Sequence, residues 1–520
     1  MTAIVDPAPV EGGVDPGGAP PKGLRSGALG VLAGTAIGLG AAAPAYSLAA
    51  ALGFVVAYVG RQAPIVMLIG FVPMLFVAIG YGQLNRVAPD CGTTFTWVTR
   101  AFGPGLGWLG GWAVIATDVI VMANLAQIAG QYLYQVVGAH GLAGDKGWTL
   151  LAGLAWIGAM TAIGCVGVEV GARVQYVLVA LQLATLLIFS GVALAKVYGG
   201  RAGPQAIHPA WSWFDPFHAS FSAFSLGLLT AAFAYWGWDA AVSVNEETRD
   251  RGRVPGRAAV TSTVVLAATY ALVTISAQAF AGTGGRGVGL AAPDHSGDVL
   301  SVLGAEVFGT AGLGWLLAKL LVLMVLASAA ASILSRIMPA ARTALAMAVY
   351  RAVPARLARI GDRCLTPTES TVGIGLLAMA FYLTMTLISR NVLADTISSL
   401  GLMIAFYYGL TGVTCAWWFR REARRSTGAF FVRFLLPLVG GLVLFAFLAK
   451  GLYQFWAPGY GATSWTLPFS PRWRIGGVFL AGIAASLFGV LLMIVHRHVH
   501  RPFFQRETLA RETGLPTPEE

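Results

Sequence analysis

The sequence predicts an all-α integral membrane protein, on the evidence of its composition, its long apolar runs and the distribution of its basic residues. The 520 residues are 57% hydrophobic and only 11% charged, whereas soluble domains carry about 25% charged residues. Apolar runs such as 177–195, 431–449 and 475–495 reach the roughly 20 residues that cross a hydrocarbon core as a helix. A membrane β-barrel would instead show short alternating segments.

Twelve transmembrane helices are expected from these runs. They lie near 28–50, 64–84, 105–135, 148–167, 172–196, 219–245, 258–281, 303–334, 371–389, 392–418, 430–450 and 474–496. With both termini on the inner side, 24 of the 34 Lys and Arg residues fall on inner segments. Cytoplasmic loops show this excess, so we expect a multi-pass plasma membrane protein, such as one of a bacterial inner membrane, with both termini cytoplasmic. The net charge of +11 then reflects topology and does not indicate a nucleic-acid partner.

Residues 1–24 are rich in Pro and Gly and are expected to form a disordered cytoplasmic tail, without the pattern of a secretory signal.

The remaining composition argues against catalysis and against a pore. The four cysteines have no metal-ligand spacing, so no metal or cofactor is expected. The histidines avoid the centres of the spans, which argues against a membrane enzyme. No rings of charged or polar residues indicate a channel.

The first and sixth spans each contain residues that interrupt a helix. Pro44 lies in the middle of residues 34–53, and Gly237 precedes Trp238 and Asp239 within 228–247. Proline removes a backbone donor and glycine weakens a helix, and paired breaks in two halves of a chain indicate a transporter site. Amides at such a break suit a carboxylate, and free carbonyls suit an ammonium group or a cation. The alternative is packing, since Gly and Pro are common in membrane helices.

Three segments, in order, resemble the amino acid–polyamine–organocation permeases. Residues 89–112 ("PDCGTTFTWVTRAFGPGLGWLGGW") resemble the loop after span two of that family. Residues 233–260 ("FAYWGWDAAVSVNEETRDRGRVPGRAAV") resemble its sixth span, and residues 332–354 are similar to the Ser-Arg segment after span eight. With twelve spans, the resemblance extends over about residues 24–500.

The resemblance implies a LeuT-like five-plus-five inverted repeat with discontinuous helices one and six, working by alternating access. The first repeat would occupy 25–200, the second 201–425 and the last two spans 426–500, followed by a cytoplasmic tail at 501–520. The family's substrate-binding positions correspond to Ala43, Pro44, Ala45, Tyr46, Ser47, Phe233, Ala234, Tyr235, Trp236 and Gly237.

The sequence departs from the family pattern at two places. The usual glycine-rich break of span one reads "AAAPAYS" here, which leaves the amides that bind a carboxylate less open. Many relatives carry in span five a lysine that takes part in proton coupling, and Gln182 stands at about that position. A glutamine does not titrate, so that mechanism does not transfer.

Asp118 lies well inside span three, where a carboxylate is costly and indicates a functional role. It could pair with a substrate amine, pair with a basic residue or carry a proton; the structural alternative is burial against Lys319 or neighbouring hydroxyls. Asn124 is 600° further round the helix and is expected to face another neighbour.

Asp239 opens the second half of span six, where we favour a role as a helix cap over a role at the gate. Tyr235 and Trp236 are expected to close over the substrate, with plain packing as the alternative. Glu246 and Glu247 lie near several arginines, and a solvated charge cluster is favoured over an inner-gate ion pair.

Ser328 and Ser332 share one face of span eight. Hydroxyls in this region hold the ion in sodium-coupled relatives, but small residues for helix packing are the favoured interpretation.

Together these features predict a permease that moves an amino acid, with an amine or polyamine permease of the same fold as the alternative. The expected partners are the small-molecule substrate, the lipid bilayer and H+ or Na+ as the coupling ion. The substrate's identity, the direction of transport and the coupling ion are not encoded in these patterns.

Overall fold

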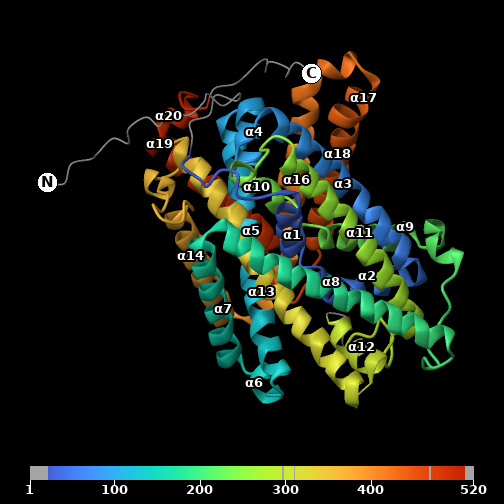
Figure 1. Cartoon of the computed structure of the whole chain (residues 1–520). Helices are drawn as coiled ribbons and strands as arrows, with labels where there is room; N and C mark the ends of the chain where they lie inside the picture. Colours follow the sequence, from blue (N-terminus) through green and yellow to red (C-terminus); the bar gives the residue numbers. More distant parts are fainter. Residues whose placement is uncertain (1–21, 295–297, 310, 468–469, 510–520) are drawn as a thin grey trace.

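The computed structural model describes residues 22–294, 298–309, 311–467 and 470–509 as a helical bundle with one small hairpin (Figure 1). The α-helices are α1 (Val31–Ala42), α2 (Pro44–Val59), α3 (Ala63–Val87), α4 (Thr94–Phe102), α5 (Pro104–Val136), α6 (His140–Gly144), α7 (Lys146–Val166), α8 (Val168–Tyr198), α9 (Phe221–Ala234), α10 (Ala240–Ser243), α11 (Val254–Ala281), α12 (Val299–Phe308), α13 (Gly312–Val349), α14 (Thr368–Ile388), α15 (Arg390–Ser398), α16 (Leu400–Phe419), α17 (Thr427–Ala429), α18 (Leu436–Phe455), α19 (Gly477–Val499) and α20 (Arg501–Phe504).

Short 3-10 and π segments and two strands complete the secondary structure. The 3-10 segments are η1 (Gly60–Gln62), η2 (Trp211–Phe214), η3 (Pro216–His218), η4 (Asn245–Glu247), η5 (Ala355–Ala358) and η6 (Glu422–Arg424), and η7 (Phe430–Leu435) is a π-helix. Strands β1 (Ser464–Leu467) and β2 (Ser470–Gly476) pair antiparallel. This hairpin is the one departure from the predicted all-α class among the described residues.

Within the described residues, ten helices or runs of helices are long and apolar enough to cross a membrane. The first run, Val31–Val87, holds α1, α2, η1 and α3 and corresponds to the first two predicted spans. Two shorter apolar helices, α9 and α12, lie outside the ten. The chain is therefore a helical membrane protein, as its composition predicted.

The predicted boundaries of span eight were wrong. The sequence placed one span at 303–334, whereas α12 ends at Phe308 and α13 begins at Gly312 and continues to Val349. The residues after 334 continue α13, and Pro339 is accommodated inside this helix. The last span also starts later than predicted, because residues 474–476 belong to β2.

Segments far apart in the sequence meet at one end of the bundle. Lys22 pairs with Asp90, the Tyr350 hydroxyl donates to the same carboxylate, and the Thr508 hydroxyl donates to the Tyr350 carbonyl. We call this end the terminal face; α4, α17 and α20 also lie there, at the top of Figure 1. The end that carries α6 and α12 is called the opposite face.

Small residues allow α1 to lie deep in the bundle, packed against α8, α11 and α13. A Cβ atom at Gly34 would lie 2.9 Å from Ala258 Cβ, and one at Gly38 would lie 2.6 Å from Ser262 Oγ. The backbones of α1 and α11 thus approach as closely as membrane helices do at small-residue interfaces. This packing holds the end of α1 at the centre of the molecule.

Candidate functional site

The junction between α1 and α2 is a single residue, Ala43, in the left-handed conformation (φ 49°). Pro44 follows at the first position of α2, where its missing N–H is not needed. The Ser332 hydroxyl donates to the Ala41 carbonyl at 3.0 Å, and the Ser47 hydroxyl donates to the Ala42 carbonyl at 2.7 Å. Side chains therefore satisfy the carbonyls at the end of α1.

The junction between α9 and α10 is longer, and side chains again donate hydrogen bonds to its backbone carbonyls. Helix α9 ends at Ala234, α10 begins at Ala240, and Gly237 between them has a φ of 127°. The Tyr270 hydroxyl donates to the Ala234 carbonyl at 3.0 Å. Arg336 Nη2 donates to the Trp236 carbonyl at 3.2 Å.

The two junctions touch each other. A Cβ atom at Gly237 would lie 2.7 Å from the Ala42 nitrogen and 2.8 Å from the Ala41 carbonyl carbon. Only glycine combines this backbone conformation with this approach. The positive φ and the contact together explain why a glycine stands at 237.

A cavity of about 800 Å³ lies against both junctions. Its walls are mostly apolar and come from α1, α2, α5, α9, α13, α15, α16 and the segment after α18. The lining includes Ala41, Ala42, Ala43, Tyr46, Ser47, Phe54, Asn124, Leu125, Ile128, Phe233, Ala234, Trp236, Ser332, Arg336, Ile404, Phe455 and Tyr460. Its size and apolar lining suit a small organic molecule.

Arg336 contributes a guanidinium group to this cavity from α13. Its Cζ lies 3.3 Å from the centre of the Trp236 ring, so the guanidinium stacks on the indole. Its Nη1 lies 3.5 Å from Asp118 Oδ1, and both side chains are 3% exposed. Sequence patterns did not indicate Arg336, because it lies two residues beyond the predicted end of span eight.

Of the alternatives for Asp118, the structure shows pairing with a basic residue, which is Arg336 and not Lys319. The Lys319 ammonium donates to the Gln135 carbonyl. Asn124 faces a different neighbour from Asp118, as predicted, since it lines the cavity and its amide donates to the Tyr46 hydroxyl.

The predicted capping role of Asp239 was also wrong. Its side chain makes no hydrogen bond to the first turn of α10. Its carboxylate instead accepts hydrogen bonds from the Tyr407 hydroxyl at 3.1 Å and the Tyr408 hydroxyl at 2.9 Å. Trp236 Nε1 donates to the Tyr407 oxygen, which connects Asp239 to the cavity wall.

The predicted site residues divide into two groups. Those that line the cavity are Ala43, Tyr46, Ser47, Phe233, Ala234, Trp236 and Ser332. Those that are buried outside its lining are Pro44, Ala45, Tyr235, Gly237, Asp118, Asp239, Gln182, Glu246 and Ser328. Tyr235 packs against Tyr270, with ring centroids 4.9 Å apart.

Gln175 of α8 lies against the last turn of α1. Its amide Nε2 donates to the Ala331 carbonyl at 2.7 Å, and its Oε1 lies close to Gly40. Gln182 lies about two helical turns further along α8, fully buried, and neither atom of its amide has a hydrogen-bond partner among the described residues. The correspondence of Gln182 to the family's span-five lysine stays a prediction.

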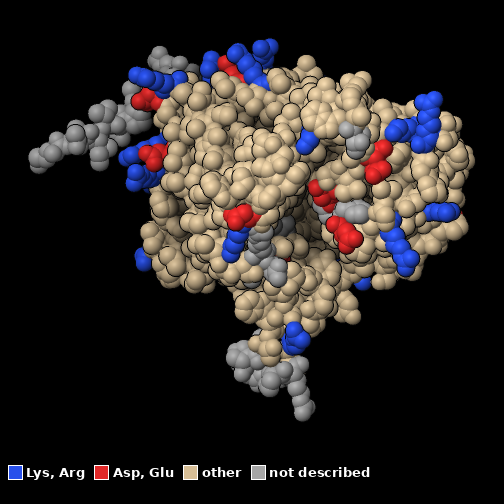
Figure 2. All heavy atoms as spheres, turned by 90° about the horizontal axis from the view of Figure 1, so that it is seen from below, with Lys and Arg blue, Asp and Glu red and all other residues tan. Residues whose placement is uncertain are grey.

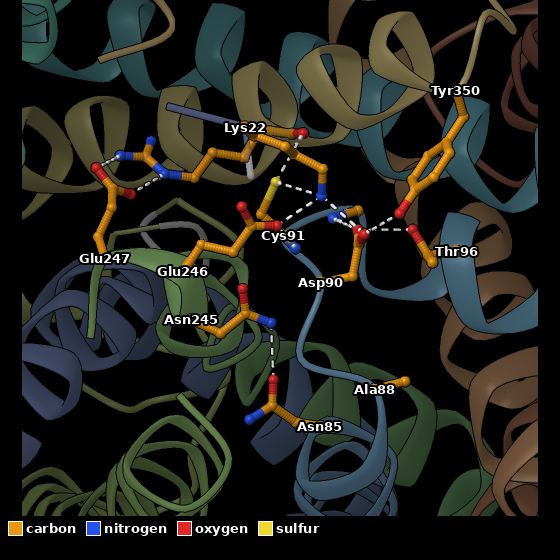
Figure 3. A network of polar contacts seen from close by, with 12 residues as sticks. Lys22, Asn85, Ala88, Asp90, Cys91, Thr96, Asn245, Glu246, Glu247 and Tyr350 are labelled. Carbon is orange, nitrogen blue, oxygen red and sulfur yellow. Dashed lines mark hydrogen bonds and ion pairs between the residues drawn. The ribbon is translucent and has the colours of Figure 1, made fainter. Parts of the chain in front are cut away.

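A second cluster of charged residues closes the terminal face (Figure 3). The Lys22 ammonium lies 2.7 Å from Asp90 Oδ2 and 2.5 Å from Glu246 Oε1. Arg342 binds Glu247 through two hydrogen bonds of 2.6 and 2.9 Å. The prediction of a solvated cluster was wrong, because Glu246 and Glu247 are buried.

The electrostatics of this cluster favour its charged form. Burial opposes ionisation, but the Lys22 charge and hydrogen bonds from Lys22, Tyr350 and Thr96 lower the pKa of Asp90 to about 2. The pKa of Lys22 is raised well above its usual value, because its acidic neighbours outweigh the cost of burial. Burial and the Glu246 charge raise the pKa of the Cys91 thiol. Asp90, Cys91 and Glu246 could together face a metal ion, but the Lys22 ammonium already contacts all three side chains.

Comparison with known proteins identifies the family. The family model described as "Amino acid permease" matches residues 29–494. The chain belongs to the amino acid permease family. This transporter family fits the predicted resemblance to amino acid–polyamine–organocation permeases.

Several curated relatives are similar to this transporter at low identity. A transporter of Mycobacterium tuberculosis, named as uncharacterised, is 27% identical over 428 residues, which cover 81% of each chain. The "Branched-chain amino acid permease" of Lactococcus lactis is 26% identical over 38% of this chain, a match that spans only 44% of that protein. The "Low-affinity putrescine importer" of Escherichia coli is 26% identical over 36% of this chain and 39% of its own length.

Proposed function

We propose that this chain is a secondary active transporter that carries an amino acid across the plasma membrane by alternating access. The observation that carries the proposal is the cavity of about 800 Å³ against both helix junctions. The substrate is held there, where two interrupted helices meet. Membership of the amino acid permease family supports the same function.

The proposed architecture has twelve crossings and a LeuT-like five-plus-five inverted repeat. In it, α1 with α2 forms the first crossing and α9 with α10 forms the sixth. Residues 25–200 and 201–425 form the two repeats. Transporters of this kind bind substrate near the midplane at discontinuous helices, and the contact between the two junctions of this chain supports the same arrangement.

The proposed state has the cavity accessible from the opposite face and the terminal face closed. Exposed residues line the cavity mouth, among them Phe54, Gly459 and Gly461, and the opposite face is hollowed near its centre (Figure 2). At the other end, Lys22 and Arg342 join η4 to its neighbours through buried ion pairs. Because basic residues gather on the segments of the terminal face, we assign it to the cytoplasm.

The inner gate in this proposal is the cluster around Lys22 and Glu246. Access from the cytoplasm requires η4 to move away from the loop after α3, and both ion pairs oppose that movement.

The coupling ion in this proposal is H+ or Na+. Gln182 does not titrate, so its side chain does not carry the proton. Ser328 accepts a hydrogen bond from the Tyr46 amide and Ser332 donates one to the Ala41 carbonyl, so both hydroxyls already have backbone partners.

An amine or polyamine permease is the second candidate, since one relative is named as a putrescine importer. The carboxylate of Asp118 was the reason to expect such a cargo from the sequence. In the structure Arg336 lies beside that carboxylate, and Asp118 does not line the cavity. These contacts favour the amino acid.

Counterflow in proteoliposomes tests the proposal. Purified protein is reconstituted with a mixture of unlabelled amino acids inside, and uptake of each radiolabelled amino acid is measured with and without external putrescine. Uptake of radiolabelled putrescine is measured in the same way into liposomes loaded with unlabelled putrescine. We expect at least one amino acid to accumulate above protein-free liposomes, without competition by putrescine. Accumulation of putrescine alone would favour the second candidate, and no exchange of either class would contradict a transporter of this kind.

A further inference from the structure

Among the described residues that line the cavity, Arg336 is the one charged side chain. Asp118 lies 3.5 Å from Arg336, Asp239 accepts hydrogen bonds from Tyr407 and Tyr408, and neither carboxylate lines the cavity. A molecule inside the cavity can therefore contact a guanidinium and no carboxylate among the described lining residues. A cationic group would be desolvated there beside a guanidinium, which is unfavourable.

The backbone at the junctions has little left to offer a carboxylate. Pro44 has no N–H, the Tyr46 amide donates to Ser328 Oγ at 3.4 Å, and the Ser47 amide donates to the Ala43 carbonyl at 2.8 Å. The Gly237 amide donates to the Tyr408 oxygen. A helix start binds an anion through unpaired amides, and here most of them already have partners.

Arg336 has the unused donors that the junctions lack. Its Nε has no hydrogen-bond partner among the described residues, and the 3.5 Å from Nη1 to Asp118 exceeds a usual charge-assisted hydrogen bond. Stacking on Trp236 and the bond to the Trp236 carbonyl fix the guanidinium plane. A fixed, buried and partly unpaired guanidinium is suited to a carboxylate.

The other residues that line the cavity indicate the chemistry of the rest of the ligand. Phe54, Leu125, Ile128, Phe233 and Ile404 give the cavity an apolar surface. The neutral oxygens of Tyr46, Asn124 and Ser332 lie among them and can accept a bond from an ammonium group. No carboxylate among the described lining residues is present to bind a second, side-chain amine.

We propose that Arg336 receives the carboxylate of the substrate, and that the cargo is an amino acid with an apolar side chain. Diamines and amino acids with a cationic side chain are excluded. This inference rests on the proposed transport function and adds the substrate class. The competing explanation is that Arg336 only holds Asp118 and the Trp236 carbonyl in place.

Matched ligand pairs test the inference on the unaltered protein. Thermal stabilisation of the full chain in detergent is titrated with leucine and 3-methylbutylamine, and with phenylalanine and 2-phenylethylamine, each pair differing only in the carboxylate. A ligand that binds the folded state raises its melting temperature. We expect each amine to bind about 10- to 100-fold more weakly than its amino acid, the usual range for a charged hydrogen bond, and lysine to bind no better than the amines.

Arg336→Gln and Arg336→Lys separate recognition from structure. In Arg336→Gln the ratio of the affinity for the amino acid to the affinity for its amine should fall close to one. Arg336→Lys should keep part of the preference. Lys319→Gln, which removes a charge elsewhere on α13, should keep all of it. A purely structural arginine would lower the melting temperature without changing the ratio of affinities.

The outcomes distinguish this inference from the function on which it rests. Equal binding of an amino acid and its amine by the unaltered protein would overturn the role of Arg336 and leave the transporter intact. So would a preference that persists in Arg336→Gln. Failure of every amino acid and amine in both binding and counterflow would overturn the proposed function itself. The comparison on the unaltered protein decides the matter even where a variant does not fold.

Discussion

The Lys22 ammonium lies 2.7 Å from the Asp90 carboxylate, across 68 residues of sequence, and their side chains are 1% and 3% exposed. The contact belongs to a segment that precedes the first helix, and the same ammonium also binds Glu246 (Figure 3). The Leu29 amide further along this segment donates to the Glu247 carbonyl, and the Arg249 amide donates to Leu29. Residues 22–30, the described part of the chain before α1, are thus an integral part of the closed terminal face.

Replacing Lys22 should loosen the terminal face and expose Cys91. Breaking a buried ion pair by removing one partner costs about 3–5 kcal/mol, and Cys91 is fully buried next to Lys22. In a variant that keeps Cys91 alone, with Cys165→Ser, Cys364→Ser and Cys415→Ala, Lys22→Gln should speed alkylation by a maleimide at least about tenfold, or roughly 1.4 kcal/mol. The matched control is Arg25→Gln on the same segment, whose ion pair is exposed and is worth little. An unchanged rate in Lys22→Gln would show that Lys22 does not hold the face closed.

The closed terminal face should be insensitive to pH across the physiological range. The pKa of Asp90 is lowered to about 2, so its contribution to stability is complete above its unfolded value near 4 and is lost only as pH falls toward 2. The pKa of Lys22 is raised, so its contribution is complete below about 10.4 and is lost at still higher pH. Accessibility of Cys91, measured as alkylation corrected for the thiolate fraction, should therefore stay constant from pH 5 to pH 9. A sharp rise within that interval would assign the gate to another titrating group.

The ion pair of Arg342 and Glu247 should behave as one unit. Arg342 contacts both carboxylate oxygens at 2.6 and 2.9 Å, and the side chains are 4% and 0% exposed. Arg342→Gln and Glu247→Gln should each destabilise the protein by about 3–5 kcal/mol, because each leaves an unpaired buried charge. The double variant should lose clearly less stability than the sum of the losses in the two single variants. Melting temperatures in detergent measure all three, and strictly additive losses would mean that the two residues act independently.

Gly237→Ala should disrupt the contact between the two junctions. The added Cβ atom would lie 2.7 Å from the Ala42 nitrogen, at a φ that side chains rarely adopt. We expect loss of counterflow and a melting temperature several degrees lower. The matched control is Gly191→Ala on α8, where a Cβ atom meets nothing within 4 Å and where alanine favours the helix by about 1 kcal/mol. Normal transport by Gly237→Ala would place substrate binding away from this junction.

Features that depend on local sequence could be predicted. Long apolar runs identified a helical membrane protein, and Pro44 and Gly237 marked the ends of α1 and α9 because their backbone chemistry acts locally. Resemblance placed Tyr46, Phe233 and Trp236 at what proved to be the cavity wall.

Partners brought together by tertiary packing could not be predicted in the same way. Arg336 looked like part of a basic loop, and only the continuation of α13 to Val349 carries it into the bundle. Lys22 lies in a segment whose composition suggests disorder, yet Asp90 and Glu246 lie next to it in space. Asp239 looked like a helix cap because Tyr407 and Tyr408 are about 170 residues away and no local pattern connects them.

Substrate protection of a cysteine in the cavity wall tests the central claim most directly. Ala50 lines the cavity on α2 and is half-buried, so Ala50→Cys in a cysteine-free background should react with a methanethiosulfonate reagent added from the opposite face. We predict that the amino acid which gives counterflow slows this reaction at least tenfold, while a cysteine at the exposed Val137 reacts at an unchanged rate. If a transported amino acid leaves the Ala50→Cys rate unaltered, the cavity between the two junctions is not the transport site.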